Sequence, residues 1–138
     1  MLSTTPFEVP PYLLEFAKGN PPVRMAVAGA DNAVALESAK QATDAGLIEP
    51  VLVGDSSTIK SLAETLSWDI SNIEIINTAG DDSASAAAVK LAHDGDATAL
   101  MKGHVHTDAL MKAVVNKQTG LRIGRRLSHI FHMTIPGR

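Results

Sequence analysis

The residues best suited to chemistry lie in one short segment, Lys102-Gly103-His104-Val105-His106-Thr107. A lysine and two imidazoles supply hydrogen-bond donors, and a glycine lets the backbone approach a ligand closely. The segment follows a short apolar run and precedes an amphipathic one, which is typical of a turn between a buried strand and a helix. Such a turn presents unpaired backbone N–H groups and the positive end of a helix dipole to an anion. We therefore predict a phosphate-binding turn; the alternative is that Thr107 caps a helix beginning at Asp108 while both histidines lie in solvent.

A second basic stretch, residues 120–126 (GLRIGRR), brings three arginines close to two glycines. These arginines are Arg122, Arg125 and Arg126. A guanidinium group can bind a phosphate with two parallel hydrogen bonds, and the glycines would let the loop wrap around it. The stretch predicts further phosphate contacts, without indicating which arginine makes them; the alternative is a solvated basic loop.

Two other histidine arrangements suggest sites that their spacing argues against. His104 and His106 with His129 and His132 could offer four nitrogens to a metal, but residues three apart on a strand point to opposite faces. The chain has no cysteine and no H-E-x-x-H pattern, so we predict no metal site. Ser128 beside His129 resembles a nucleophile with its base. Adjacent strand residues point apart, however, and no G-x-S-x-G elbow is present.

Elements that would position these residues follow from the hydrophobic pattern, in which apolar runs alternate with helical spacing. Strands are predicted over residues 23–28, 51–53, 73–76, 99–101 and 127–135. Helical patterns cover residues 12–17, 34–46, 59–66, 81–93 and the stretch after Thr107, and either Asp31 or Asn32 can cap the second of these. Alternation with short connections predicts an α/β fold of three layers, α/β/α, around a mainly parallel sheet.

Length and composition limit the class of protein. The 138 residues are 45% hydrophobic and 20% charged, which is ordinary for one globular domain. The net charge of −3 argues against nucleic acid as a partner, and no apolar run approaches the length that spans a membrane. With no cysteine and no signal-peptide pattern, we expect a cytoplasmic protein. We divide it into a lead-in with a helix (residues 1–22) and an α/β domain (residues 23–138).

The last predicted strand is followed only by Pro136-Gly137-Arg138. A sheet that ends without a covering helix leaves one face or edge bare. We therefore expect the polypeptide to continue in the parent protein, or a partner to cover this surface. The alternative is that the preceding helices suffice.

Two long segments resemble the phosphate acetyltransferase and phosphate butyryltransferase family: PPVRMAVAGADNAVALESAKQATDAGLIEPVLVGD and LMKGHVHTDALMKAVVNKQTGLRIGRRLSHIFHMTIPG. The similarity is strongest to the acyltransferase part of bifunctional enoyl-CoA hydratase/phosphate acetyltransferase proteins. The resemblance implies reversible acyl transfer, in which acetyl-CoA or butyryl-CoA and phosphate give an acyl phosphate and CoA. It also implies two α/β domains like those of isocitrate and isopropylmalate dehydrogenases, with the active site in the cleft between them. Members are cytoplasmic homodimers that use CoA as a substrate and hold no tightly bound cofactor or metal.

The resemblance also assigns a role in binding phosphate or substrate to ten residues of this chain. They are Lys102, Gly103, His104, His106, Thr107, Arg122, Arg125, Arg126, Ser128 and His129. Family enzymes are longer, and their Asp-Leu-Ser-Arg-Gly motif, which supplies much of the catalytic apparatus, has no counterpart here. We therefore expect the first domain of such an enzyme, inactive alone, with its catalytic residues unassigned and its acyl chain length open. The alternative is a non-catalytic α/β module that binds phosphate or a nucleotide.

Overall fold

The computed structural model describes residues 9–121, 127, 128, 130, 131 and 133. Helices and strands alternate along the chain as the hydrophobic pattern predicts. In order they are α1 (Pro11–Lys18), β1 (Val23–Ala28), α2 (Ala33–Asp44), β2 (Ile48–Gly54), α3 (Ser56–Thr65), β3 (Glu74–Asn77), α4 (Asp81–His93), β4 (Ala99–Lys102) and α5 (Thr107–Val114).

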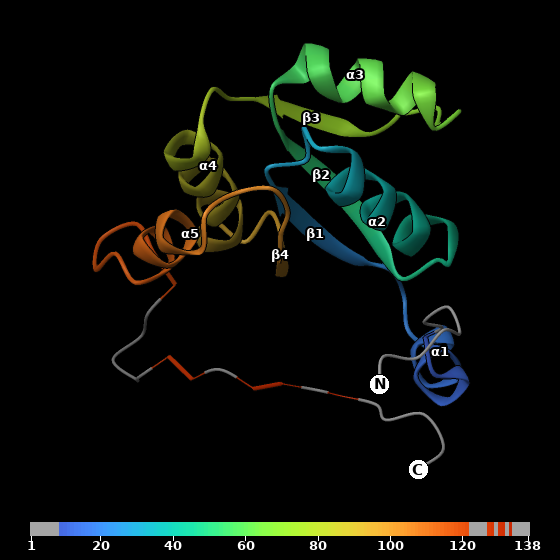
Figure 1. Cartoon of the computed structure of the whole chain (residues 1–138). Coiled ribbons are helices and arrows are strands. Elements are labelled where there is room, and N and C mark those ends of the chain that lie inside the picture. The colour runs from blue at the N-terminus through green and yellow to red at the C-terminus, as the bar shows by residue number, and fades with distance from the viewer. Residues whose placement is uncertain (1–8, 122–126, 129, 132, 134–138) are drawn as a thin grey trace, which may run out of the picture.

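The strands form one parallel sheet in the order β3-β2-β1-β4. Helices α2 and α3 cover one face of this sheet, and α4 and α5 cover the other (Figure 1). The predicted three-layer α/β/α fold with a parallel sheet is therefore confirmed. The chain builds the sheet outward from β1 through β2 to β3, and α4 then carries it back across to the other side of β1.

The core has two parts because successive residues of a strand point to opposite faces of the sheet. Ala26 and Ala28 of β1 pack on the α4 side, where Ala88 lies fully buried against them. Val27, between them, packs on the other side with Leu36 of α2. Small side chains on β1 and α4 let the helix approach the sheet closely, which explains how a chain with 4% aromatic residues fills its core.

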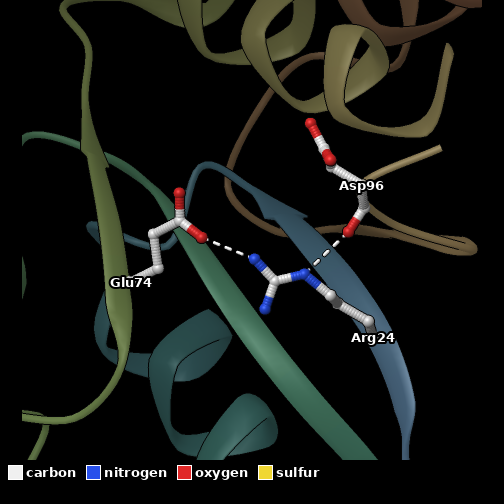
Figure 2. Close-up of polar contacts among 3 residues, drawn as sticks. All are labelled: Arg24, Glu74 and Asp96. Atoms are coloured by element: carbon white, nitrogen blue, oxygen red, sulfur yellow. Dashed lines mark hydrogen bonds and ion pairs between the residues drawn. The ribbon is translucent and has the colours of Figure 1, made fainter. Parts of the chain in front are cut away.

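A single charged residue interrupts the apolar run of β1, and it ties the amino ends of the elements together. Figure 2 shows Arg24 between Glu74 of β3 and Asp96, which precedes β4. Its Nη2 lies 2.5 Å from Glu74 Oε2, and its Nε donates to the Asp96 carbonyl at 2.7 Å. Since β2 lies between β1 and β3 in the sheet, this side chain spans a strand.

The structure differs from the predicted elements at the carboxyl end. A strand was predicted over residues 127–135, but none of the described residues 127, 128, 130, 131 and 133 is in a strand. The prediction is wrong at these positions, because an alternating pattern forms a strand only where the chain reaches the sheet, and these residues lie outside its four strands. Large apolar side chains there are exposed, including Ile130 (86%) and Met133 (80%).

Helix α1 forms where it was predicted, but it contributes no buried residue. Its Phe16 side chain is 83% exposed. The rest of the predicted lead-in, residues 1–8, lies outside the described residues. Among the helices of the described residues, none has both the length and the apolarity to cross a bilayer.

Candidate functional site

The carboxyl ends of β1 and β4 lie side by side in the sheet. Among the described strands, β2 and β3 extend the sheet on one side of β1, and β4 lies on its other side. From Ala28 the chain enters α2 on one face, and from Lys102 it enters α5 on the opposite face. In open α/β sheets, ligands bind in the crevice that this divergence opens beyond the strand ends. The topology therefore selects the loops after β1 and β4 as the candidate site.

The two loops are joined by backbone hydrogen bonds at the base of this crevice. Gly103 N donates to the Ala28 carbonyl and His104 N donates to the Gly29 carbonyl, both at 2.8 Å. The approach needs glycine on both sides: a Cβ on Gly103 would lie 2.4 Å from Gly29 O, and a Cβ on Gly29 would lie 2.7 Å from His104 O. These contacts hold the two loops in one fixed arrangement.

A hollow of about 390 Å³ lies above this junction, between the start of α2 and the end of β4. Its lining consists of Asn32, Val34, Ala35, Ser38, Met101, Lys102, Gly103 and His104. This volume is within the range of small-molecule sites, about 300–1,000 Å³. Lys102 and His104 are exposed there, and the lining contains no carboxylate. The hollow therefore suits an anionic group.

Two adjacent polar residues after β1 have separate tasks, which the sequence left open. Asn32 caps α2: its Oδ1 accepts from Val34 N at 3.0 Å and from Ala35 N at 3.3 Å. Asp31 turns the other way, and its Oδ2 accepts from Asp55 N at 3.1 Å in the loop after β2. The carboxylate is thereby engaged beside β2, while the amide lines the hollow.

The predicted phosphate-binding turn is divided by the structure. Lys102, Gly103 and His104 line the hollow, whereas His106 lies beside Asp81 at the start of α4. Asp81 Oδ2 accepts from His106 N at 2.8 Å and lies 3.8 Å from His106 Nε2. His106 therefore belongs to the α4 and α5 layer and does not line the hollow.

The prediction that Thr107 caps the following helix is wrong. Thr107 is the first residue of α5, and His106 occupies the N-cap position without a side-chain cap. The carboxylate of Asp81 takes over part of that role, because it accepts the hydrogen bond of His106 N from another helix. A local motif cannot reveal such a partner, which lies 25 residues away in sequence.

The backbone amides expected to face a phosphate are also partly engaged. Gly103 N and His104 N donate to carbonyls of the β1 loop, and His106 N donates to Asp81. The loops after β1 and β4 therefore offer an anion chiefly side chains, not a row of free N–H groups.

Two other hollows are larger but lie away from the strand ends of β1 and β4. One, of about 800 Å³, runs along α3 and the edge strand β3. The other, of about 600 Å³, lies between α4 and α5. The smaller hollow at the divergence of the two loops is preferred because it combines the topology of ligand sites with an exposed cation.

Sequence comparison assigns the chain to a known protein family. The profile of the family described as "Phosphate acetyl/butaryl transferase" matches residues 11–87, more than half of the chain. The chain belongs to this family. It is 40% identical over 123 residues to the phosphate acetyltransferase of Rickettsia felis, covering 89% of this chain and 35% of the relative. It is 37% identical to the phosphate butyryltransferase of Clostridium beijerinckii, covering 91% of this chain and 41% of the relative.

This chain is also similar in fold to solved structures of phosphotransacetylases. A phosphotransacetylase from Streptococcus pyogenes superposes with a TM-score of 0.64 at 15% identity, covering 78% of this chain and 42% of that one. The EutD phosphotransacetylase from Staphylococcus aureus superposes with a TM-score of 0.59 at 21% identity, covering 78% and 43%. The chain thus spans well under half of the length of these relatives.

The remaining predicted site residues cannot be placed in the hollow. Arg122, Arg125, Arg126 and His129 lie outside the described residues. Ser128 is described, exposed and outside any helix or strand. Groups of three or more metal-ligating side chains are not found among the described residues.

Two polar residues of the hollow were not predicted as site residues: Asn32 and Ser38. Asn32 was recognised only as a candidate helix cap. It lies in the connection between a strand and the following helix, which is the same signal that selected Lys102–His104, so the rule for strand ends could have found it. Ser38 lies within α2, nearly two turns beyond Asn32, and carries no local signal.

Proposed function

We propose that this chain provides the phosphate-binding part of a phosphate acyltransferase, which transfers an acyl group between CoA and orthophosphate. The observation that carries the proposal is the hollow lined by Lys102 and His104 in a chain of this family. Acyl transfer from CoA requires a phosphate oxygen to attack the thioester carbon, after which the carbon–sulfur bond breaks and the thiolate leaves. A fixed cation beside the phosphate offsets the charge that gathers on these groups in the transition state.

Within this mechanism the described residues bind and orient, and none is assigned as the base. Lys102 and His104 supply donors to the phosphate, and the contact between Gly29 and Gly103 fixes their position. The three arginines of residues 120–126 stay a prediction as further phosphate ligands. Ser128, His129, His106 and Thr107 likewise stay predictions, although His106 has a competing partner in Asp81.

We also propose a two-domain architecture like that of isocitrate and isopropylmalate dehydrogenases for the complete enzyme, with residues 23–138 in the first domain. The support is the share of the relatives that this chain covers, 35% and 41% of their lengths. On this basis the chain alone lacks part of the active site and turns over slowly or not at all. The complete enzyme would be a cytoplasmic homodimer that binds CoA, phosphate and acyl phosphate and holds no tightly bound cofactor.

The test measures acyl transfer with acetyl phosphate or butyryl phosphate and CoA, following formation of the thioester. Three proteins are compared: this chain, the Rickettsia felis relative, and a chimera in which this chain replaces the matching 123 residues of that relative. We expect activity in the chimera that falls at least about tenfold when Lys102→Gln is introduced.

Full activity of this chain alone would contradict the proposal that it lacks part of the site. A chimera that folds and binds phosphate but never turns over would favour the non-catalytic module instead.

A further inference from the structure

The oxygen of the Asn32 side chain accepts hydrogen bonds within the protein, whereas its nitrogen is available to a ligand. Its Oδ1 accepts the hydrogen bonds of Val34 N and Ala35 N. The Nδ2 amide donates no hydrogen bond to any part of the chain that the structure describes. Because the side chain lines the hollow, this amide is the group that it offers to a ligand.

The composition of the hollow defines the ligand that this amide suits. The polar and charged residues that line this space are Lys102, His104, Ser38 and Asn32, and no carboxylate lines it. The nearest acid in sequence, Asp31, accepts from Asp55 N on the β2 side. Donors and a cation without a competing anion are the chemistry of a phosphoryl site.

We propose that Asn32 is a phosphoryl-binding residue whose Nδ2 amide and the Lys102 ammonium hold the same phosphate group from opposite walls of the hollow. The inference rests on the proposed function and adds to it a residue that comes from α2, not from the basic turn. One wall belongs to the loop after β1 and the other to the end of β4, so the Gly29–Gly103 contact sets their separation. The phosphoryl group is that of an acyl phosphate or of CoA, and the experiment distinguishes these sources.

The fold offers an informative substitution at this position. Asn32→Asp retains an oxygen that can cap α2, since aspartate and asparagine are equally good N-caps. It replaces the N–H donor of the hollow with a negative charge. A residue that only caps the helix would tolerate this change, whereas a phosphoryl ligand would not.

A matched control exists on the other side of the molecule. Asn116 Oδ1 accepts from Gln118 N at 2.9 Å and from Thr119 N at 3.0 Å, so its side chain makes the same kind of turn contact as Asn32. It lines the groove between α4 and α5 and not the hollow. Asn116→Asp therefore changes net charge and capping chemistry equally, away from the proposed site.

The experiment titrates the 138-residue chain and its variants with inorganic phosphate, acetyl phosphate and CoA, following backbone amide shifts by NMR, and records each thermal midpoint. We expect Asn32→Asp to weaken phosphate binding by about tenfold or more without lowering the thermal midpoint. Asn116→Asp should bind as the wild type does. Asn32→Ser, a neutral cap without the amide, should weaken binding by a smaller factor and carries the test if Asn32→Asp unfolds.

The ligands separate the two sources of the phosphoryl group. Weakened binding of acetyl phosphate with unchanged CoA binding assigns the hollow to the acyl donor, and the reverse assigns it to a phosphate of CoA. Unchanged binding in both Asn32 variants, while Lys102→Gln weakens it, would overturn the role of Asn32 and leave the proposed function standing. A wild-type chain that binds none of the three ligands would overturn both.

Discussion

Gly103 shows how a single residue determines the geometry with which the loops after β1 and β4 meet. Its missing side chain allows the β4 loop to touch the β1 loop, with backbone carbonyls of Ala28 and Gly29 in the space that a Cβ would take. Backbone atoms at these positions cannot move aside as a flexible side chain would. The residue is therefore required for packing before any role in ligand binding is considered.

We expect Gly103→Ala to lower the free energy of unfolding by about 1–3 kcal/mol, because the new Cβ must force the two loops apart. Urea denaturation measures the change. Gly19→Ala is the control, since its Cβ would meet nothing within 4 Å and its φ of −77° suits any residue. An equal effect of both substitutions would show that the close approach does not matter.

Asp55 is a residue whose titration makes the stability of the protein depend on pH. Hydrogen bonds from the Thr58 side chain, the Thr58 backbone N–H and the Ser57 side chain hold the pKa of Asp55 below its ordinary value. A carboxyl group whose pKa is lower in the folded state stabilises the protein above its unfolded pKa, about 3.9. That stabilisation disappears as the pH falls through the folded pKa.

Asp55→Asn keeps a cap oxygen for Thr58 N but removes the titration. We expect the advantage of the wild type over Asp55→Asn to shrink as the pH falls from about 6 to about 3. Urea unfolding of both proteins across this range measures it. Other acids whose pKa is lowered, such as Asp69 and Asp94, are present in both proteins and cancel in the difference. A difference that is constant with pH would contradict the expectation.

At the scale of elements, the carboxyl ends of the strands are held by close backbone contacts and the amino ends by one side chain. Arg24 joins β1 to β3 and to the segment before β4 (Figure 2). Its ion pair with Glu74 is partly exposed, so the charge attraction alone contributes little. The hydrogen bond from Nε to the Asp96 carbonyl adds a charge-assisted contact to a backbone group.

We expect Arg24→Met to cost about 1–2 kcal/mol of unfolding free energy, because it removes both contacts. Glu74→Gln should cost less than about 1 kcal/mol, since it removes only the partly exposed pair. Denaturant unfolding of the single and double variants gives both values and their coupling. A larger loss for Glu74→Gln than for Arg24→Met would show that the Asp96 contact is unimportant.

At the scale of the whole molecule, apolar side chains lie outside the core at both ends of the described chain. Tyr12 and Phe16 of α1 are exposed, as are Leu127, Ile130 and Met133. Contiguous exposed apolar surface favours association with other surfaces. In the three-layer body itself, by contrast, large apolar residues are mostly enclosed between helices and sheet.

We therefore expect the isolated chain to associate increasingly as its concentration rises, which sedimentation velocity measures. Ile130→Ser combined with Met133→Ser should reduce this association without changing the thermal midpoint, because neither residue belongs to the core. Val34→Ser serves as the control, since it removes one exposed large apolar side chain from a different part of the surface. Unchanged association in the double variant would exclude Ile130 and Met133 as its cause.

The local elements and the fold class can be predicted from the order of the amino acids alone. Residues 23–28 and 81–93 form the predicted strand and helix with the same bounds, because hydrophobic periodicity is a property of neighbouring residues. The family also follows from the sequence, and the residue types of the Lys102–His104 turn alone indicate a candidate site.

Which residues share the site becomes known only from the way the elements pack in three dimensions. This packing placed Asn32 and the Lys102–His104 turn in the lining of one hollow, paired His106 with Asp81, and left the described positions among residues 127–133 outside the sheet. The physical reason is the crossover from β3 to β4, which brings the end of β4 against the end of β1 although more than 70 residues separate Ala28 from Lys102. No local pattern encodes this contact, because it forms only when β4 pairs with the side of β1 that faces away from β2.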